Sequence, residues 1–246
     1  MLYSISNYLV NLLRLSDTGI NYYSVIMKER FSILAGFILF SFTSSLAQTK
    51  FSEGSIVYNV TVNTNDPNPK LADGFDGATN TIYIKGKLSR SELVSVFGTQ
   101  STIIDGRTGK VSVLKEYGDK KYIINMTPAD WIEANQKYDS VTFSYENEFK
   151  TIAGYNCQKA IGKLKNGETF TVYFTKELIP ENQDFQYSNR HLPGLALEYE
   201  SNLGKNKVIF SASKISFDPV PASKFDLPKA GFRIMTYQES KTAGKN

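Results

Sequence analysis

The sequence predicts a mainly β (β-rich α+β) protein: a single, mostly antiparallel sheet with one or two short helices. Three observations predict this fold class. Short segments rich in Val, Ile, Thr, Tyr and Phe recur along the chain, turn residues separate them, and only one segment carries the start signal of a helix.

Strand signals extend from residue 55 to residue 217. Residues 55–62 alternate as a half-buried strand does, with Ile56, Tyr58, Val60 and Val62 on one side. The other predicted strands lie at residues 81–84, 101–104, 110–114, 121–126, 141–145, 169–174, 195–199 and 207–217.

Turn signals between these runs predict a meander. Asn166-Gly167 is the strongest hairpin signal, and a two-residue loop would place Lys165 opposite Glu168. The same register predicts Ile161 opposite Val172. Gly and Asp mark further reversals at residues 105–109 and 117–119.

One helix is predicted after Thr127, which can cap the helix while the following proline begins its first turn. Residues 129–137 would then be helical, with Trp131 and Ile132 facing the sheet. Residues 63–77 are rich in Asn, Asp, Pro and Gly and predict a loop.

Several strands are apolar on both faces, for example residues 82–84 and 172–174. A sheet with one solvent-exposed face would carry polar residues on that face. A second apolar surface is therefore predicted. It would line a ligand cavity, be covered by a helix, or form the seam of a two-sheet sandwich, and the pattern does not choose among these.

The N-terminal region has the pattern of a secretory signal peptide at residues 27–47. A charged start is followed by an apolar run at residues 31–42 and by small residues before a cut after Ala47. The run is shorter than the roughly 20 residues of a membrane span, although a membrane anchor is the alternative. We expect residues 1–26 to be an extension upstream of a true start at Met27, residues 48–239 to form one β-rich domain, and residues 240–246 to be a disordered tail.

Composition argues against several classes of function. The net charge is only +4 and no basic cluster is interleaved with aromatic residues, so no nucleic-acid partner is predicted. With a single cysteine, Cys157, and a single histidine, His191, neither a disulfide nor a standard zinc site is predicted. No cofactor motif occurs. Asp66, Asp73 and Asp76 lie in one loop, but their spacing does not fit an EF-hand, and a solvated loop is expected.

The segment HLPGLALEYE, residues 191–200, is interpreted as a structural corner. Pro193 suits a strand entrance and Gly194 permits close backbone approach. Cys157 is interpreted as a buried apolar residue. The alternative is a hydrolase in which Cys157 attacks and His191 acts as the base, which requires the two side chains to meet.

Two segments resemble the GLPGLI family of exported bacterial proteins of unknown function. Residues 192–198 are similar to the name motif, through Leu192, Pro193, Gly194, Leu195 and Ala196, and residues 152–160 are similar to a second motif, through Gly154, Tyr155 and Cys157. His191 and Ala196 stand where the name motif has glycine and isoleucine. A neighbouring group of exported domains that shares both segments is the alternative.

This resemblance implies a fold and a function. Both groups look like relatives of the LolA-type lipoprotein carriers, which implies a single curved antiparallel sheet or half-barrel with helices closing a greasy concave face. It brings no catalytic residues.

The expected function is non-enzymatic binding of a hydrophobic or lipid-like ligand against Tyr83, Tyr173 and Phe174. The alternative is a structural or interaction protein of the envelope or secretion machinery, without a cavity and with an exposed apolar patch or free sheet edge. The expected location is the periplasm, the outer-membrane periphery or the outside of the cell, with no membrane span after signal cleavage.

Overall fold

The computed structural model describes residues 48–63, 74–203 and 206–243. The predicted upstream extension and signal peptide, residues 1–26 and 27–47, lie outside the described residues. Among the described residues, no helix combines the length and the apolar character needed to cross a bilayer.

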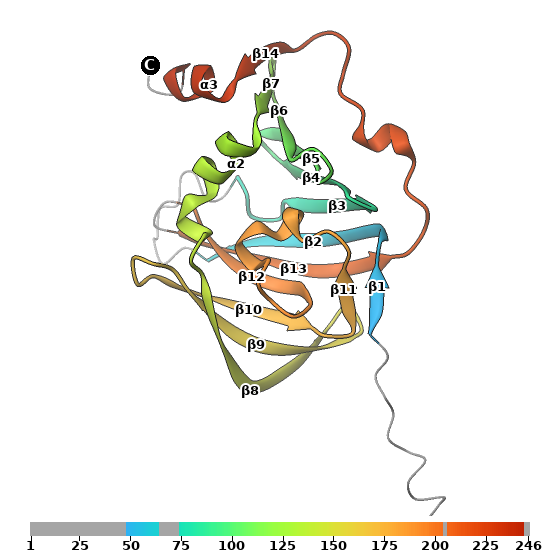
Figure 1. Ribbon diagram of the computed structural model, residues 1–246, viewed down its shortest axis with the longest axis vertical. Helices are drawn as coiled ribbons and strands as arrows, with labels where there is room; N and C mark the ends of the chain where they lie inside the picture. Colours follow the sequence, from blue (N-terminus) through green and yellow to red (C-terminus); the bar gives the residue numbers. More distant parts are fainter. Residues whose placement is uncertain (1–47, 64–73, 204–205, 244–246) are drawn as a thin grey trace, which may run out of the picture. The chain divides into compact units, whose positions relative to one another are not determined.

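Twelve of the described strands form one sheet in the order β14-β7-β6-β5-β4-β3-β2-β13-β12-β10-β9-β8 (Figure 1). All neighbours in this sheet pair antiparallel except β14 and β7. The strands are β2 (Glu53–Asn63), β3 (Thr79–Lys85), β4 (Leu88–Ser95), β5 (Gly98–Asp105), β6 (Lys110–Tyr117), β7 (Lys120–Met126), β8 (Thr142–Ile152), β9 (Tyr155–Lys163), β10 (Thr169–Thr175), β12 (Leu195–Leu203), β13 (Asn206–Ser216) and β14 (Arg233–Thr236). Strands β1 (Thr49–Phe51) and β11 (Leu178–Pro180) pair in parallel beside this sheet. The predicted mainly β, mostly antiparallel fold is confirmed.

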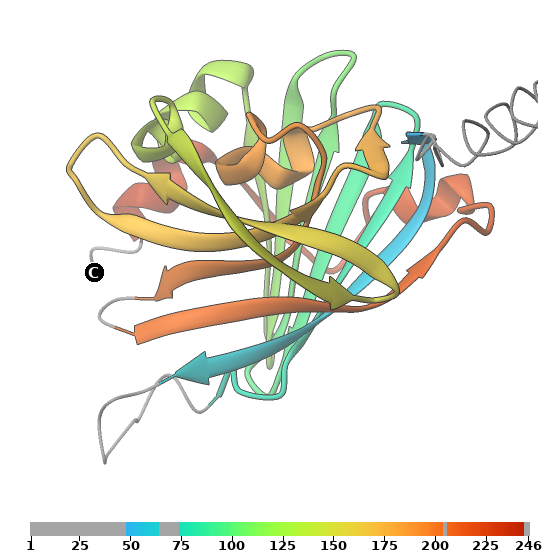
Figure 2. The ribbon, with the colours of Figure 1, turned by 90° about the horizontal axis from the view of Figure 1, so that it is seen from below.

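The large sheet is curved and open. Strands β8 to β13 arch across the direction of β3 to β7 (Figure 2), which gives the sheet an inner and an outer face. We define the inner face by one row of paired residues: Tyr145, Ala160, Val172, Tyr199, Phe210 and Val60. The adjacent row, Lys159, Tyr173, Glu198, Ser211 and Asn59, defines the outer face.

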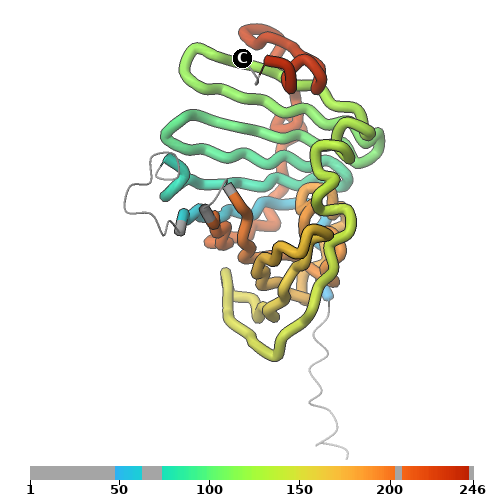
Figure 3. Tube along the Cα trace, turned by 90° about the vertical axis from the view of Figure 1, so that its left-hand side faces the viewer, coloured from blue at the N-terminus to red at the C-terminus, as the bar shows by residue number. Residues whose placement is uncertain are grey.

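The inner face is covered at one end of the strands by α2 (Pro128–Asn135), the 3₁₀ segment η2 (Gln136–Tyr138) and the 3₁₀ segment η3 (Asp184–Asn189), at the front of Figure 3. The predicted helix start is confirmed, because Thr127 and Asp130 cap each other reciprocally. Trp131 packs on the inner face beside Ile124 and Met126. The prediction for Ile132 was wrong: the side chain is 53% exposed, since it lies on the other side of α2.

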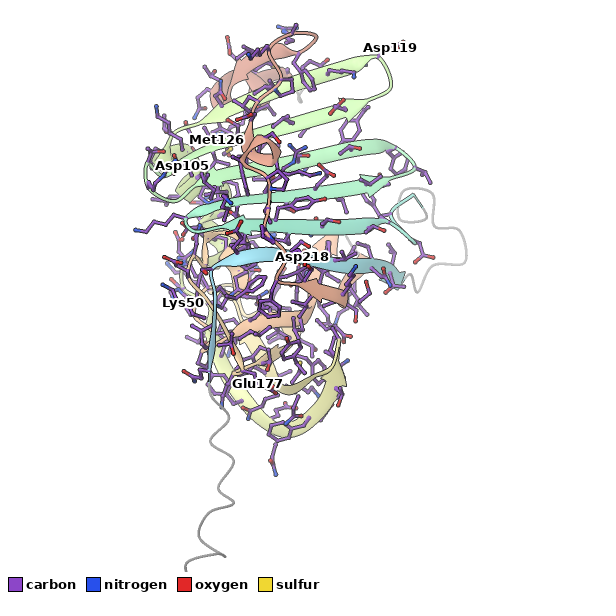
Figure 4. The ribbon with its side chains drawn as sticks, turned by 90° about the vertical axis from the view of Figure 1, so that its right-hand side faces the viewer. Lys50, Asp105, Asp119, Met126, Glu177 and Asp218 are labelled. Carbon is purple, nitrogen blue, oxygen red and sulfur yellow. The ribbon has the colours of Figure 1, made fainter. Side chains whose placement is uncertain are left out.

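The outer face of β3 to β7 is covered by the connection from β13 to β14, which crosses the sheet in Figure 4. In this connection, η4 (Ala222–Phe225) packs Phe225 and the nearby Val220 against Ile103 and Leu114. Its backbone is held by Lys85 Nζ, which donates to the Val220 carbonyl at 3.0 Å, and by other sheet side chains. The second apolar surface predicted from the sequence is thus covered here by irregular chain.

Two expectations about local structure need correction. The β9–β10 hairpin has a three-residue loop, since Gly167 adopts φ +90° and the Leu164 amide bonds to the Glu168 carbonyl at 2.8 Å. Val172 therefore pairs with Ala160, one residue away from the predicted register. The tail is also more ordered than predicted: helix α3 (Tyr237–Ala243) includes residues 240–243, and residues 244–246 lie outside the described part.

Candidate ligand-binding site

The structure separates the three residues predicted to line a ligand site. Tyr83 lies on the outer face under the β13–β14 connection, with Lys224 Nζ 4.5 Å from its ring centroid. Tyr173 also lies on the outer face. Phe174 is fully buried on the inner side, among Ala160, Val172, Leu192 and Ala196. None of the three lines a pocket described below.

The Tyr173 hydroxyl belongs to a network of charged side chains on the outer face. It donates to Glu148, which also pairs with Lys159 at 2.9 Å, and Lys150 Nζ lies 3.9 Å from the Tyr173 ring centroid. The hydrogen bond to Glu148, assisted by burial, raises the pKa of Tyr173 to about 12. These partners satisfy the hydroxyl within the protein, so it is not free for a ligand.

The corner at residues 191–194 has a clear steric basis. A Cβ on Gly194 would lie 2.0 Å from the Thr175 carbonyl oxygen, so only glycine fits. The buried Gln186 side chain holds the corner from the other side: it donates to the Gly194 carbonyl at 3.2 Å and accepts from the Ala196 amide at 3.3 Å. These contacts fix the backbone at residues 194–196, which agrees with the interpretation of this segment as a structural corner.

The alternative nucleophile and base are not assembled. Cys157 is fully buried, and burial raises the pKa of its thiol to about 12, so the reactive thiolate is disfavoured. Its Sγ donates to the Tyr155 carbonyl at 3.5 Å. His191 is exposed, and no hydrogen bond joins it to Cys157 in the described part of the chain.

The described ranges contain no group of three or more His, Cys, Asp or Glu side chains that could hold a metal ion. Of the three loop carboxylates, Asp76 accepts a hydrogen bond from the Val62 amide at 3.1 Å. Asp66 and Asp73 lie outside the described residues.

One cavity lies on the inner face beneath α2 and η3, and we call it the aromatic pocket. Its volume is about 180 Å³. Aromatic side chains in edge-to-face contact form its walls: Tyr58 and Tyr199 have ring centroids 5.7 Å apart, and Trp131 and Tyr187 5.9 Å apart. The full lining is Tyr58, Ile82, Trp131, Asn135, Tyr138, Phe185, Gln186, Tyr187, Ser188, Asn189, Ala196 and Tyr199.

Three further pockets follow, each sharing lining residues with the one before. The hairpin pocket, about 260 Å³, shares Tyr138 and Ser188 with the aromatic pocket. The central pocket, about 210 Å³, shares Ser201 and Asn202 with the hairpin pocket. The rim pocket, about 270 Å³, shares Tyr117 with the central pocket. We call this row of four pockets the inner groove.

A stacked aromatic pair lies between the aromatic and central pockets. Tyr199 lines the first and Phe210 the second, and their rings lie 4.9 Å apart at an angle of 7°. The central pocket is otherwise mainly apolar, with Val60, Leu93 and Val208 in its wall. The central pocket is therefore mainly apolar, whereas the hairpin pocket is mainly polar, with Lys137, Glu168 and Glu200 in its lining.

Sequence reasoning found part of this site and missed the rest. Trp131 was predicted to face the sheet, and Tyr58 belonged to a predicted strand face. Residues 185–189 were missed, because a short 3₁₀ segment has neither helical nor strand periodicity. The chain's only tryptophan, on a capped helix, was the available signal.

Comparison with known proteins shows similarities of fold. No family model and no curated protein matches the chain. PNGF-II in space group P21 is 14% identical with a TM-score of 0.45, over 79% of this chain and 34% of its own, so this chain spans about a third of that length. An uncharacterized conserved protein from Thermus thermophilus is 10% identical with a TM-score of 0.45, over 75% and 91%. A β-barrel-like protein of a domain of unknown function, DUF1849, from Brucella abortus is 8% identical with a TM-score of 0.34, over 70% and 99%.

Proposed function

We propose that the protein binds an elongated apolar ligand, such as a single acyl chain, along the inner groove. The observation that carries this proposal is that four pockets follow one another along this face and share lining residues with their neighbours. Each pocket alone is below the roughly 300 Å³ at which drug-sized ligand sites begin. A chain that lies across two or more of them uses the available space.

The energetics favour a ligand that extends beyond the aromatic pocket. Each buried methylene contributes about 0.8 kcal/mol, so ten methylenes give about 8 kcal/mol before costs. Association costs at least about 4 kcal/mol in lost freedom. A short chain confined to one pocket would therefore bind weakly, whereas a chain that continues past Phe210 into the central pocket gains the additional burial.

A role in the cell envelope goes with this binding function. The signal-peptide pattern at residues 27–47 supports export, and the resemblance to the GLPGLI family and to LolA-type carriers supports a non-enzymatic carrier. In this proposal the protein holds a lipid-like ligand in the periplasm, at the outer-membrane periphery or outside the cell.

One observation favours the interaction alternative. Strand β8 ends the large sheet, and Tyr145 and Phe149 on it are 49% and 51% exposed. An unpaired sheet edge with exposed aromatic residues is a surface for strand pairing. In the alternative, a partner protein of the envelope adds a strand to β8 and the groove stays without ligand.

Native mass spectrometry of the protein purified from its own cells, followed by lipid extraction, tests the proposal. A bound mass of one acyl lipid per chain is the expected result. A ligand-free mass, with co-purification of a protein that is lost on a Tyr145→Asp substitution, would favour the interaction alternative.

A matched pair of variants on β4 locates the ligand. Leu93 lines the central pocket, whereas Val94 is 47% exposed on the opposite face of the same strand. We expect Leu93→Trp to fill the pocket and remove the bound lipid, and Val94→Trp to retain it. Equal retention by both variants would place the lipid elsewhere.

A further inference from the structure

Two buried polar atoms of residues that line the aromatic pocket have no hydrogen-bond partner in the described part of the protein. Six such side-chain atoms occur among the described residues, and two of them, Trp131 Nε1 and Asn189 Oδ1, belong to residues that line this pocket. Asn189 is only 1% exposed, so bulk solvent does not solvate its side chain. Buried polar groups are normally hydrogen-bonded, so a hydrogen-bond partner is expected for each of the two atoms.

Three other polar side chains of the pocket, Tyr58, Gln186 and Tyr187, are hydrogen-bonded within the protein. The Tyr58 hydroxyl donates to the Ala196 carbonyl at 2.8 Å, and the Tyr187 hydroxyl donates to Asp139 at 2.9 Å. Gln186 uses both ends of its amide at the corner. Among the buried side-chain atoms of the lining residues, one donor, the indole N–H, and one acceptor, the Asn189 carbonyl oxygen, lack a partner.

The pocket also contains no charged side chain. None of its lining residues is Asp, Glu, Lys, Arg or His. The neighbouring Arg190 and Asp139 pair with each other at 3.3 Å, and Arg190 stacks 3.8 Å from the Tyr187 ring centroid. An ionised group in this cavity would lose its hydration without gaining a counter-ion, which is costly.

We propose that the aromatic pocket receives an uncharged, hydroxyl-bearing head group of the acyl ligand, and that Trp131 and Asn189 select it. This inference rests on the proposed function and adds the ligand's class and direction. A hydroxyl accepts from Trp131 and donates to Asn189. A carboxylate only accepts and an ammonium only donates, so each leaves one protein group unpaired. The head lies under α2, and the chain extends toward Phe210.

Isothermal titration calorimetry with three probes of equal chain length tests this selection. The probes are dodecanol, dodecanoate and dodecylammonium at neutral pH, each below its solubility limit. We expect dodecanol to bind roughly tenfold more tightly than either charged probe, since a satisfied hydrogen bond contributes up to about 1.5 kcal/mol. Asn189→Leu should remove most of the advantage over dodecanoate, which does not pair with Asn189, and Trp131→Phe should remove most of the advantage over dodecylammonium, which does not pair with Trp131.

The outcomes separate the inference from the proposed function. If no probe binds the wild-type protein, the proposed function fails and the inference fails with it. If all three probes bind equally, the groove function holds and the head-group selection is wrong. If both variants bind dodecanol as the wild type does, ordered water alone pairs the two atoms, and the selection is again wrong.

A second measurement needs no variant. Because Trp131 is the only tryptophan, the protein has one indole N–H resonance in a ¹⁵N-correlation spectrum. Dodecanol should shift its proton downfield through the new hydrogen bond, whereas dodecane, which cannot accept one, should not. The same shift with both probes would overturn the inference.

Discussion

The outer and inner faces of the sheet are both apolar, yet they are covered in different ways. On the outer face, the β13–β14 connection lies directly on the strands, with Val220 and Phe225 packed among sheet residues. On the inner face, α2 and η3 cover the aromatic pocket, and two of its lining residues have unpaired polar atoms. Similar strand patterns can thus produce a packed surface or a binding surface, depending on what lies over them.

Hydrogen bonds from side chains of the sheet hold the β13–β14 connection close to the outer face. Arg90 Nη1 donates to the Lys224 carbonyl at 3.1 Å, and Glu53 accepts from the Val220 amide at 2.9 Å. These bonds hold backbone that has no regular partner of its own. The cover of the inner face, α2 and η3, has secondary structure of its own. Its backbone therefore does not need to lie directly on the strands.

The largest expected loss of stability is in the β13–β14 connection, which covers the outer face. Phe225→Ala should lower the free energy of unfolding by about 3 kcal/mol, because it leaves a cavity against Ile103 and Leu114. Urea unfolding measures this. Leu227→Ala, at a position 41% exposed in the same connection, is the control and should cost less than about 1 kcal/mol. Equal costs would mean that the connection is not packed as described.

Substitutions of two buried amide side chains, Gln186 and Asn189, test which contacts hold the cover of the inner face in place. Gln186→Leu should cost about 2 kcal/mol, because it leaves the Gly194 carbonyl and the Ala196 amide unpaired. Asn189→Leu should leave stability within about 0.5 kcal/mol, since the Asn189 carbonyl oxygen has no partner to lose. Chemical denaturation of both variants checks the contrast, which disappears if Asn189 has a hidden partner.

A smaller loss of stability is expected at the N-terminal cap of α2. Thr127→Ala should cost about 1 kcal/mol, because the Thr127 side chain accepts from the Asp130 amide at 3.2 Å. Since α2 carries Trp131, the variant should also bind dodecanol more weakly. Thr127→Ser keeps the hydroxyl and should behave as the wild type in thermal unfolding and calorimetry. An unchanged affinity in the alanine variant would show that the inner cover does not depend on the cap.

The smallest effect is a pH dependence at the same cap. The hydrogen bonds from the Thr127 side chain and amide hold the pKa of Asp130 below its usual range. This stabilisation is present above the unfolded pKa of about 3.9 and is lost as the pH falls through the lower folded value. Asp130→Asn should therefore be less stable than the wild type at pH near 7, and the difference should vanish in strong acid. A pH-independent difference, from unfolding curves along a pH series, would contradict the cap.

The fold class followed from the sequence because alternation reports burial directly. Strand β4 escaped prediction, since its buried positions include the polar Ser89, which is only 1% exposed. The β9–β10 register was one residue off because Asn-Gly is compatible with a longer loop, and here Gly167 occupies its left-handed position.

The site was harder to predict than the fold. Trp131 could be placed on a helix facing the sheet, but Asn189 and Tyr187, which line the same pocket, come from a distant 3₁₀ segment. Tyr83 and Tyr173 were assigned to a ligand because their strands are apolar on both faces, and sequence periodicity does not say which face receives a cover of chain. That choice depends on the path of the β13–β14 connection.

The pairing of β2 with β13 has a consequence for the order of folding. Ser55 pairs with Ser216 and Asn63 with Lys207, so the middle of the sheet joins segments from opposite ends of the domain. Strands β2 to β7 can pair locally as a meander, but contacts between distant segments form slowly. Until β13 arrives, β2 presents a free edge able to pair with another copy of the chain. The nascent protein is therefore most prone to aggregate at the strand that becomes the centre of the finished sheet.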